Sequence, residues 1–492
     1  MMDDIYSHYQ DPEQLVSGQL ALLLAILASA AAMYQYFVTE VQLEASETDA
    51  LHSSLFWTNS ALEMLEISRR TSAGQIEDVQ ATILLSFLLY HLEGFSVRTR
   101  GLFSSALCAA RELSLHKIDG PGIRSSEFRA REDPVYLEVK RRIIWHVVAT
   151  DWLLALSGGP QEGTYTMQTR HMLVNRPRNV DDDDITQDPS LDQPISSPST
   201  MSYYLQRINL ADLCRSVADA IPLLSVDISA IDYKDIITLD RRFEALLEGL
   251  PYFLKTDEHN RKRSEDVLLK YPQLRAQRFS FAMVALTRRC KLHQPFLIRG
   301  SVHQEYKYSR EVSLRSARSV IKMKRVVEQE SGPLFGTDVK LTGISHHIFM
   351  ATIVLVTDLC FNRGREDDDE RKTEVIEALK LLEEAKCRSQ IVSKFVESLE
   401  NVLRKHKVRL LNRRCTGDDN DRSNTEGDRP LLKSQTIEEQ IGIVPEPWDS
   451  LEDPMSYPSE IDSVWRDYVQ LGPNLEMPEW DSLFSDLDST FH

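Results

Sequence analysis

The chain has 492 residues, of which 42% are hydrophobic and 27% are charged, and it contains only 19 glycines and 20 prolines. This composition excludes a disordered or fibrous chain, and the scarcity of turn residues disfavours an all-β sandwich or barrel. The formal net charge of −18 lacks the positive balance with which a dedicated nucleic-acid-binding domain neutralises phosphates.

Helical periodicity begins near the N-terminus. Residues 20–38, LALLLAILASAAAMYQYFV, are about as long as a membrane span, but they are rich in alanine and follow an acidic start. We expect a buried core helix here, with a membrane or signal segment as the alternative. Residues 50–70, 78–95 and 102–117 repeat apolar positions at intervals of three and four, which predicts consecutive antiparallel helices.

The next stretch, KRRIIWHVVATDWLLALSGGP at residues 140–160, is apolar on nearly every turn but carries Arg141, Arg142 and Asp151. A catalytic centre would need a nucleophile or a base beside these charges, and none accompanies them. We interpret the stretch as a buried helix whose arginines bond carboxylates or loop carbonyls and whose aspartate is a buried acceptor.

The remaining chain divides by composition. Residues 158–200 are rich in Pro, Asp and Ser and too polar for a core. Helical patterns then resume, and residues 371–407 predict two helices in sequence. We therefore expect an all-α body over residues 1–412, a polar linker over residues 413–444, and an acidic tail over residues 445–492.

The acidic tail contains a regular apolar pattern. Trp480, Leu483, Phe484 and Leu487 fall at positions i, i+3, i+4 and i+7, with acidic residues between them. This spacing predicts an amphipathic helix that folds into the apolar groove of a partner. The composition is typical of transcriptional activation segments. The alternative is that the tail packs back onto the helical body.

Several stretches over residues 20–360 resemble the regulatory region of fungal zinc-cluster transcription factors, called the middle homology region. ALCAARELSLHK is similar to its Ala-x-Arg-x-Ala-x-x-Leu-Gly-Leu-His-Arg segment, with Leu115 and His116 at matching positions. NRPRNVDDDDI, LDRRFEALLEGLPYFL and LHQPFL resemble later segments in the same order. The family's Arg-Arg-x-x-Trp helix and following turn are matched by Arg141, Arg142, Trp145, Asp151, Gly158 and Pro160.

The resemblance implies a transcription regulator of the nucleus that is not an enzyme. Its acidic tail would bind a coactivator or the transcription machinery, its helical body would sense a small-molecule effector, and its setting would be a secondary-metabolite gene cluster. Family members usually begin with a six-cysteine, two-zinc DNA-binding cluster, and the six cysteines here are too scattered to form one. We therefore expect no cofactor, zinc only if an upstream cluster exists, no membrane, and DNA contact through a DNA-binding partner.

Two other functions stay open. A co-regulator or repressor could use the same body to mask a DNA-binding partner, and an α-helical enzyme would need convergent polar groups in one pocket. His346 and His347 are adjacent, so a helix would point them about 100° apart, which is a poor start for a metal site. Residues 404–414, RKHKVRLLNRR, are either a nuclear-import patch or a cationic helix end.

Overall fold

The computed structural model describes residues 16–37, 47–72, 74–120, 133–157, 161–185, 192–221, 231–330, 342–362, 366–386, 390–406 and 408. All regular elements in these ranges are helices, which confirms the predicted all-α fold. The proposed linker and acidic tail lie outside the described residues, so the division into body, linker and tail stays a prediction.

The helices vary in length from single turns to long rods. The first seven are α2 (Ser17–Phe37), α3 (Glu47–Thr71), α4 (Ile76–Glu93), α5 (Val97–Glu112), α7 (Pro134–Leu154), α8 (Ser202–Ala220) and α9 (Tyr233–Glu248). The rest are α10 (Glu258–Arg263), α11 (Glu265–Lys270), α12 (Leu274–His293), α13 (Arg299–Val302), α14 (Lys307–Glu330), α15 (Thr342–Phe361), α16 (Asp368–Lys386) and α17 (Gln390–Lys405). The last two confirm the predicted pair of helices at that place in the chain.

Local sequence signals start several of these helices. The Asp133 carboxylate accepts a hydrogen bond from the backbone N–H of Val135, and Pro134 occupies the first turn of α7, where no backbone donor is needed. The Ser96 hydroxyl caps α5 by accepting from the backbone N–H of Thr99 at 3.1 Å. These caps place the beginnings of α5 and α7, two helices that contribute to the pocket described below.

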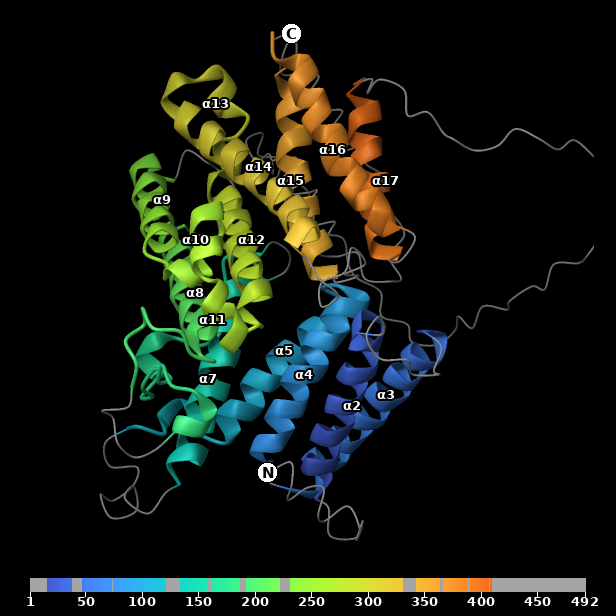
Figure 1. The fold of residues 1–492 in the computed structure, drawn as a ribbon, viewed down its shortest axis with the longest axis vertical. Coiled ribbons are helices and arrows are strands. Elements are labelled where there is room, and N and C mark those ends of the chain that lie inside the picture. The colour runs from blue at the N-terminus through green and yellow to red at the C-terminus, as the bar shows by residue number, and fades with distance from the viewer. Residues whose placement is uncertain are drawn as a thin grey trace, which may run out of the picture.

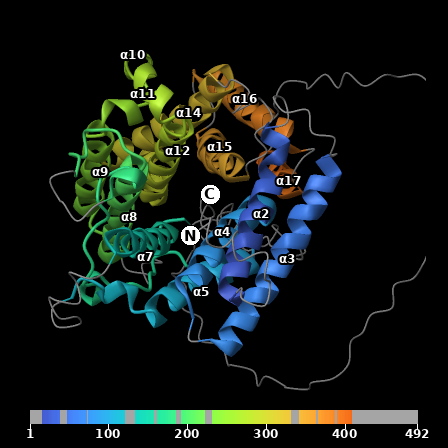
Figure 2. The same cartoon turned by 60° about the horizontal axis from the view of Figure 1, so that its bottom comes forward.

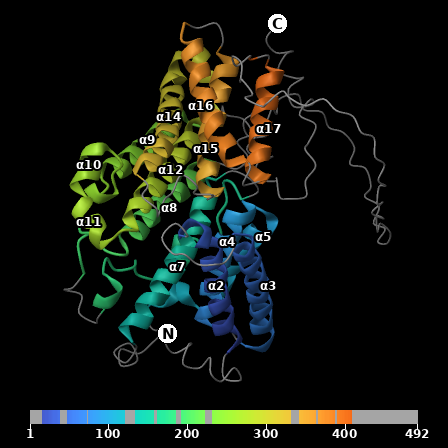
Figure 3. The same cartoon turned by 45° about the vertical axis from the view of Figure 1, so that its right-hand side comes forward.

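The helices form three groups (Figure 1). Helices α2 to α5 lie at one end of the molecule and α14 to α17 at the other, while α7 to α12 lie along one side of both groups (Figure 3). Figure 2, seen from another direction, shows the three groups arranged around the middle of the molecule.

Each group has an apolar core. Phe349 of α15 stacks on Phe395 of α17 with 4.2 Å between ring centroids, inside a core shared by α12 and α14 to α17. Trp152 of α7 is 1% exposed in a second core, to which α4, α5, α7, α8, α9 and α12 contribute. Since α12 contributes to both, it joins two of the three groups.

The two most apolar helices pack inside the protein. Residues Gly343–Phe361 of α15 are long and apolar enough to cross a membrane, but 83% of that window is buried inside the protein. The alanine-rich helix α2 packs on α3 and α4 and buries Ala21, Ala25 and Ala28 completely. Burial against neighbouring helices therefore accounts for the apolar composition of α15, while α2 buries mainly its alanines and leaves Leu27 36% exposed.

Candidate functional site

The paired arginines near the start of α7 connect the helix to the segment of residues 161–185. Arg142 bonds the segment directly, and Arg141 bonds Asp119, whose carboxylate accepts from the backbone N–H of Asn175 at 2.8 Å. Arg141 donates two hydrogen bonds to the Asp119 carboxylate, at 2.6 and 3.0 Å. Arg142 donates to the Asp182 carboxylate at 2.5 Å and to the backbone carbonyl of Val180 at 3.1 Å. Each guanidinium therefore has carboxylate oxygens as partners.

Two other signature residues of α7 bond the same segment. The indole N–H of Trp145 donates to the backbone carbonyl of Asn175 at 2.8 Å. The Asp151 carboxylate accepts from the backbone N–H groups of Thr166 and Met167, at 2.9 and 2.8 Å. Burial raises the pKa of Asp151, while these backbone hydrogen bonds act in the opposite direction. The polar groups of α7 thus satisfy backbone atoms of a segment whose regular structure consists of two single-turn 3-10 helices, η3 (Thr169–His171) and η4 (Asp182–Asp184).

Leu115 and His116 lie buried in the short 3-10 helix η2 (Leu115–Lys117). The backbone carbonyl of His116 accepts from the N–H of Leu173 at 2.7 Å, which ties the segment of residues 161–185 to η2. Burial and the nearby charge of Lys117 lower the pKa of the His116 ring. Six further residues predicted from the sequence lie outside the described residues. They are Gly158 and Pro160 of the family motif and Trp480, Leu483, Phe484 and Leu487 of the tail.

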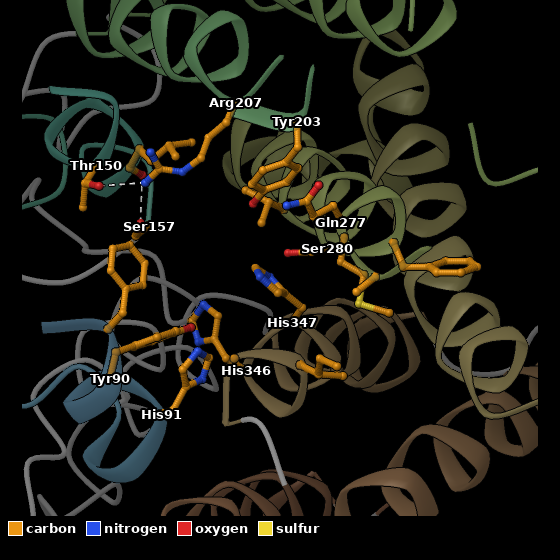
Figure 4. Close-up of a pocket in the computed structure, with 18 of the residues that line it drawn as sticks. Tyr90, His91, Thr150, Ser157, Tyr203, Arg207, Gln277, Ser280, His346 and His347 are labelled. Atoms are coloured by element: carbon orange, nitrogen blue, oxygen red, sulfur yellow. Dashed lines mark hydrogen bonds between the residues drawn. The ribbon is translucent and has the colours of Figure 1, made fainter. Parts of the chain in front are cut away.

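A cavity of about 400 Å³ lies where the three helix groups meet, which we call the central pocket (Figure 4). Its volume is within the range of small-molecule sites, roughly 300–1,000 Å³. Helices α4, α5, α7, α8, α12, α14 and α15 all contribute to its wall. Much of that wall is apolar and consists of Phe87, Phe95, Phe103, Leu153, Leu154, Phe279, Met283, Val284, Val327 and Ile344.

Three arginines line the central pocket: half-buried Arg207 from α8, and half-buried Arg275 and buried Arg288 from α12. Arg207 donates to the hydroxyl of Thr150 at 2.7 Å and to the backbone carbonyl of His146 at 3.3 Å. Arg288 is 5% exposed and donates to the hydroxyl of Ser157 at 2.7 Å. The described residues that line the pocket include no aspartate and no glutamate, so this wall is positively charged.

The opposite side of the central pocket carries three histidines and a tyrosine (Figure 4). Burial lowers the pKa of His91 to about 4 and that of His347 to about 3, and the charge of Arg288 also acts to lower the latter. The pKa of His346 is lowered for the same reasons. These rings are therefore neutral at pH 7, and each can donate or accept a hydrogen bond.

The adjacent histidines belong to the central pocket. His346 and His347 both line the pocket, and the Nδ1 atom of His347 lies 3.0 Å from the hydroxyl of Thr287. The part of the chain that the structure describes contains no group of three or more His, Cys, Asp or Glu side chains able to hold a metal ion.

A second polar cluster contains the residue types of a serine hydrolase triad. The Nε2 atom of His293 lies 2.9 Å from the Asp240 carboxylate, and its Nδ1 atom lies 2.8 Å from the Ser309 hydroxyl. All three residues are 0% exposed, and none of them lines the central pocket. Arg289 and Tyr308 also donate to Asp240. The cluster therefore joins α9, α12 and α14 in a place that a substrate cannot reach.

None of the polar residues of the central pocket was predicted from the sequence to form a binding site. Tyr90, Arg207 and Arg288 come from three helices and carry no motif. The available signal was a charge inside an apolar run, as with Arg288 in FAMVALTRRCKLH. Such a charge shows that a buried polar contact exists, but not which distant helix shares it.

No protein-family model matches the chain. It is 39% identical to the probable transcription factor lepB of Aspergillus flavus, in an alignment that covers 99% of this chain and 86% of that protein. It is 31% identical to the agnestins biosynthesis cluster transcription factor AgnL11 of Paecilomyces divaricatus, over 82% of this chain and 57% of the relative. Transcription factor TAS2 of Pyricularia oryzae is 32% identical, over 70% of this chain and 44% of the relative. The chain therefore belongs to a family of fungal transcription factors and is a transcription regulator.

Proposed function

We propose that this regulator binds a small-molecule effector in the central pocket and that binding changes its effect on transcription. The observation that carries the proposal is the position of the pocket, because its wall is built by all three helix groups. A ligand there contacts each group at once, so it stabilises one relative arrangement of the groups over another.

The pocket binds its ligand without chemical turnover. Its described lining residues offer no carboxylate or thiol to act as base or nucleophile beside the histidines. The buried Asp240, His293 and Ser309 are separate from it. These features favour an effector site over the active site of an α-helical enzyme.

The helical body corresponds to the middle homology region of the zinc-cluster type. Its support is the ordered set of motifs quoted above, together with the role that the Arg141 and Arg142 helix plays in holding residues 161–185. The name of AgnL11 ties that relative to a biosynthetic cluster, and we propose control of a secondary-metabolite gene cluster here too.

The regulator works in the nucleus and reaches DNA through a DNA-binding partner. The net charge of −18 lacks the positive balance of a DNA-binding domain, which supports the partner. The genomic sequence upstream of Met1 tests this part of the proposal. An in-frame six-cysteine pattern there would replace the partner by direct DNA binding with two zinc ions.

The acidic tail, residues 445–492, recruits a coactivator or the transcription machinery. The support is the apolar pattern at Trp480, Leu483, Phe484 and Leu487 among acidic residues. Fusion of the tail to a heterologous DNA-binding domain should activate a reporter gene. No activation would overturn this role and favour the co-regulator or repressor that masks a DNA-binding partner.

Binding to the pocket can be tested with a neutral fluorescent probe, N-phenylnaphthylamine. We expect saturable binding to the full chain and a large loss of affinity in Ser280→Trp, because Ser280 is an exposed residue that lines the pocket. Thr238→Trp is the matched control, since Thr238 is exposed on α9 and does not line the pocket. Equal binding to both variants would place the probe elsewhere and overturn the effector site.

A further inference from the structure

We infer that the effector of the central pocket is an apolar organic acid that binds as an anion, with its acidic group at Arg207 and Arg288. The inference rests on the proposed effector site and names the chemical class that the site selects. Three features of the pocket support the inference: the arginines on one wall, the neutral histidines on the opposite wall, and the apolar surface between them.

Arg207 supplies the first argument. Its hydrogen-bond acceptors, the hydroxyl of Thr150 and the backbone carbonyl of His146, are both uncharged oxygens. No carboxylate in the described part of the chain lies within ion-pair distance of its guanidinium. Arg207 is half-buried, and burial lowers the pKa of its guanidinium. A partly desolvated cation without a counter-charge is unfavourable, and a guanidinium is shaped to bind a carboxylate through two parallel hydrogen bonds. A ligand carboxylate at this place would supply the missing charge.

Arg288 places a second cation on the same wall. Its partner Ser157 follows Thr150 by seven residues, about two helical turns, so both hydroxyls lie on one face of α7 and its C-terminal turn. Figure 4 shows Thr150, Ser157 and Arg207 together on one side of the pocket and the histidines across from them. The two arginines therefore act on one region of a bound ligand.

The ligand could be a cation, a neutral molecule or an anion, and the lining residues distinguish these three classes. A cation would meet arginine side chains and no described carboxylate, so a cation is excluded. A neutral ligand would fill the apolar volume but leave Arg207 without a counter-charge. An anion with an aromatic or aliphatic body satisfies both parts, because Phe87, Phe95 and Phe103 provide the surface that its body needs.

Two fluorescent probes with the same ring scaffold test the inference. Anilinonaphthalene sulfonate is an apolar anion, and N-phenylnaphthylamine lacks only the sulfonate. We expect the full chain to bind the anion at least about tenfold more tightly, the effect of charge-assisted hydrogen bonds. Arg207→Met should abolish that preference and leave the affinity for the neutral probe within about twofold.

The control for charge removal is Arg242→Met, because Arg242 is exposed on α9, donates to Ser216 and does not line the pocket. It should keep the preference for the anion. Far-UV circular dichroism establishes that each variant is folded, and if Arg207→Met does not fold, the ratio of the two affinities in the unmodified chain decides. Ser280→Trp, which narrows the pocket, should weaken both probes.

The outcomes separate the two proposals. Equal affinity of the unmodified chain for the two probes would overturn the anionic class and leave the effector site standing. Retention of the preference in folded Arg207→Met would also overturn the assignment. Binding of neither probe, or binding that Ser280→Trp leaves unchanged, would overturn the effector site together with the inference.

Discussion

Replacement of Asp240 by Asn should destabilise the helical body far more than a similar change one turn away. Asp240 is 0% exposed on α9 and accepts from Arg289 at 2.5 and 2.9 Å and from Tyr308 at 2.6 Å, and the Nε2 atom of His293 lies 2.9 Å from its carboxylate. The Arg289 hydrogen bond holds the pKa of the carboxyl well below its usual range, against the effect of its burial.

The expected loss in the free energy of unfolding follows from the unpaired charge that Asp240→Asn creates. Asn has the shape of Asp but no charge, so Arg289 would stay buried without its main counter-ion. Loss of one partner of a buried ion pair costs about 3–5 kcal/mol. The pH dependence follows from the same pKa shift. The stabilising contribution of Asp240 is complete above the pKa of an aspartate in the unfolded chain, and it is lost as the pH falls towards the lower pKa of Asp240 in the folded protein.

Glu244→Gln is the matched control. Its carboxylate lies 3.8 Å from the same Arg289 and its side chain is 44% exposed, so we expect a loss of only about 0–1 kcal/mol. The assay is urea unfolding of the full chain followed by circular dichroism at pH 7. Equal destabilisation by the two substitutions would refute the argument that burial makes the difference.

Three other predictions concern the pocket, the segment of residues 161–185 and the tail. Burial lowers the pKa of His91 to about 4 and that of His347 to about 3. The contribution of these neutral rings to the free energy of unfolding is therefore complete above about pH 6.5. As the pH falls towards 4, up to roughly 3 kcal/mol of the contribution of His91 is lost. The urea midpoint should therefore drop between pH 7 and pH 5, and it should drop less in His91→Gln. Glu138→Gln should speed proteolysis within residues 161–185. The buried Glu138 carboxylate contacts both Arg141 and Arg142 and accepts from the backbone N–H of Arg178 at 2.9 Å, so it anchors the segment to α7. An unchanged rate of cleavage would contradict this anchoring role. Alanine at both Trp480 and Phe484 should cut reporter activation by the fused tail about tenfold or more, while substitution of two acidic tail residues by Asn should cut it less.

The helical class and several helices could be predicted because their signals are local. The apolar run at residues 140–160 predicted a buried helix, which α7 forms as far as Leu154, and the periodicity of residues 371–407 predicted two helices. The alanine-rich α2 was predicted as a core helix from its composition, and the structure packs it on α3 and α4.

The central pocket could not be predicted, because no local pattern encodes it. Its lining runs from Phe87 to His347 and depends on how helices pack across the whole body. Arg207 and Thr150 share a hydrogen bond but lie on separate helices, so neither position alone indicates a site. The triad-like set of Asp240, His293 and Ser309 was equally invisible, since those residues meet only through tertiary packing.

The central claim is that occupancy of the central pocket controls transcription. The most direct measurement compares the unmodified chain, Ser280→Trp and Thr238→Trp, each fused to a heterologous DNA-binding domain, on one reporter gene in a fungal host at equal protein abundance. We predict that Ser280→Trp changes reporter output several-fold while Thr238→Trp matches the unmodified chain. Equal output from all three, with probe binding abolished in Ser280→Trp, would contradict the claim.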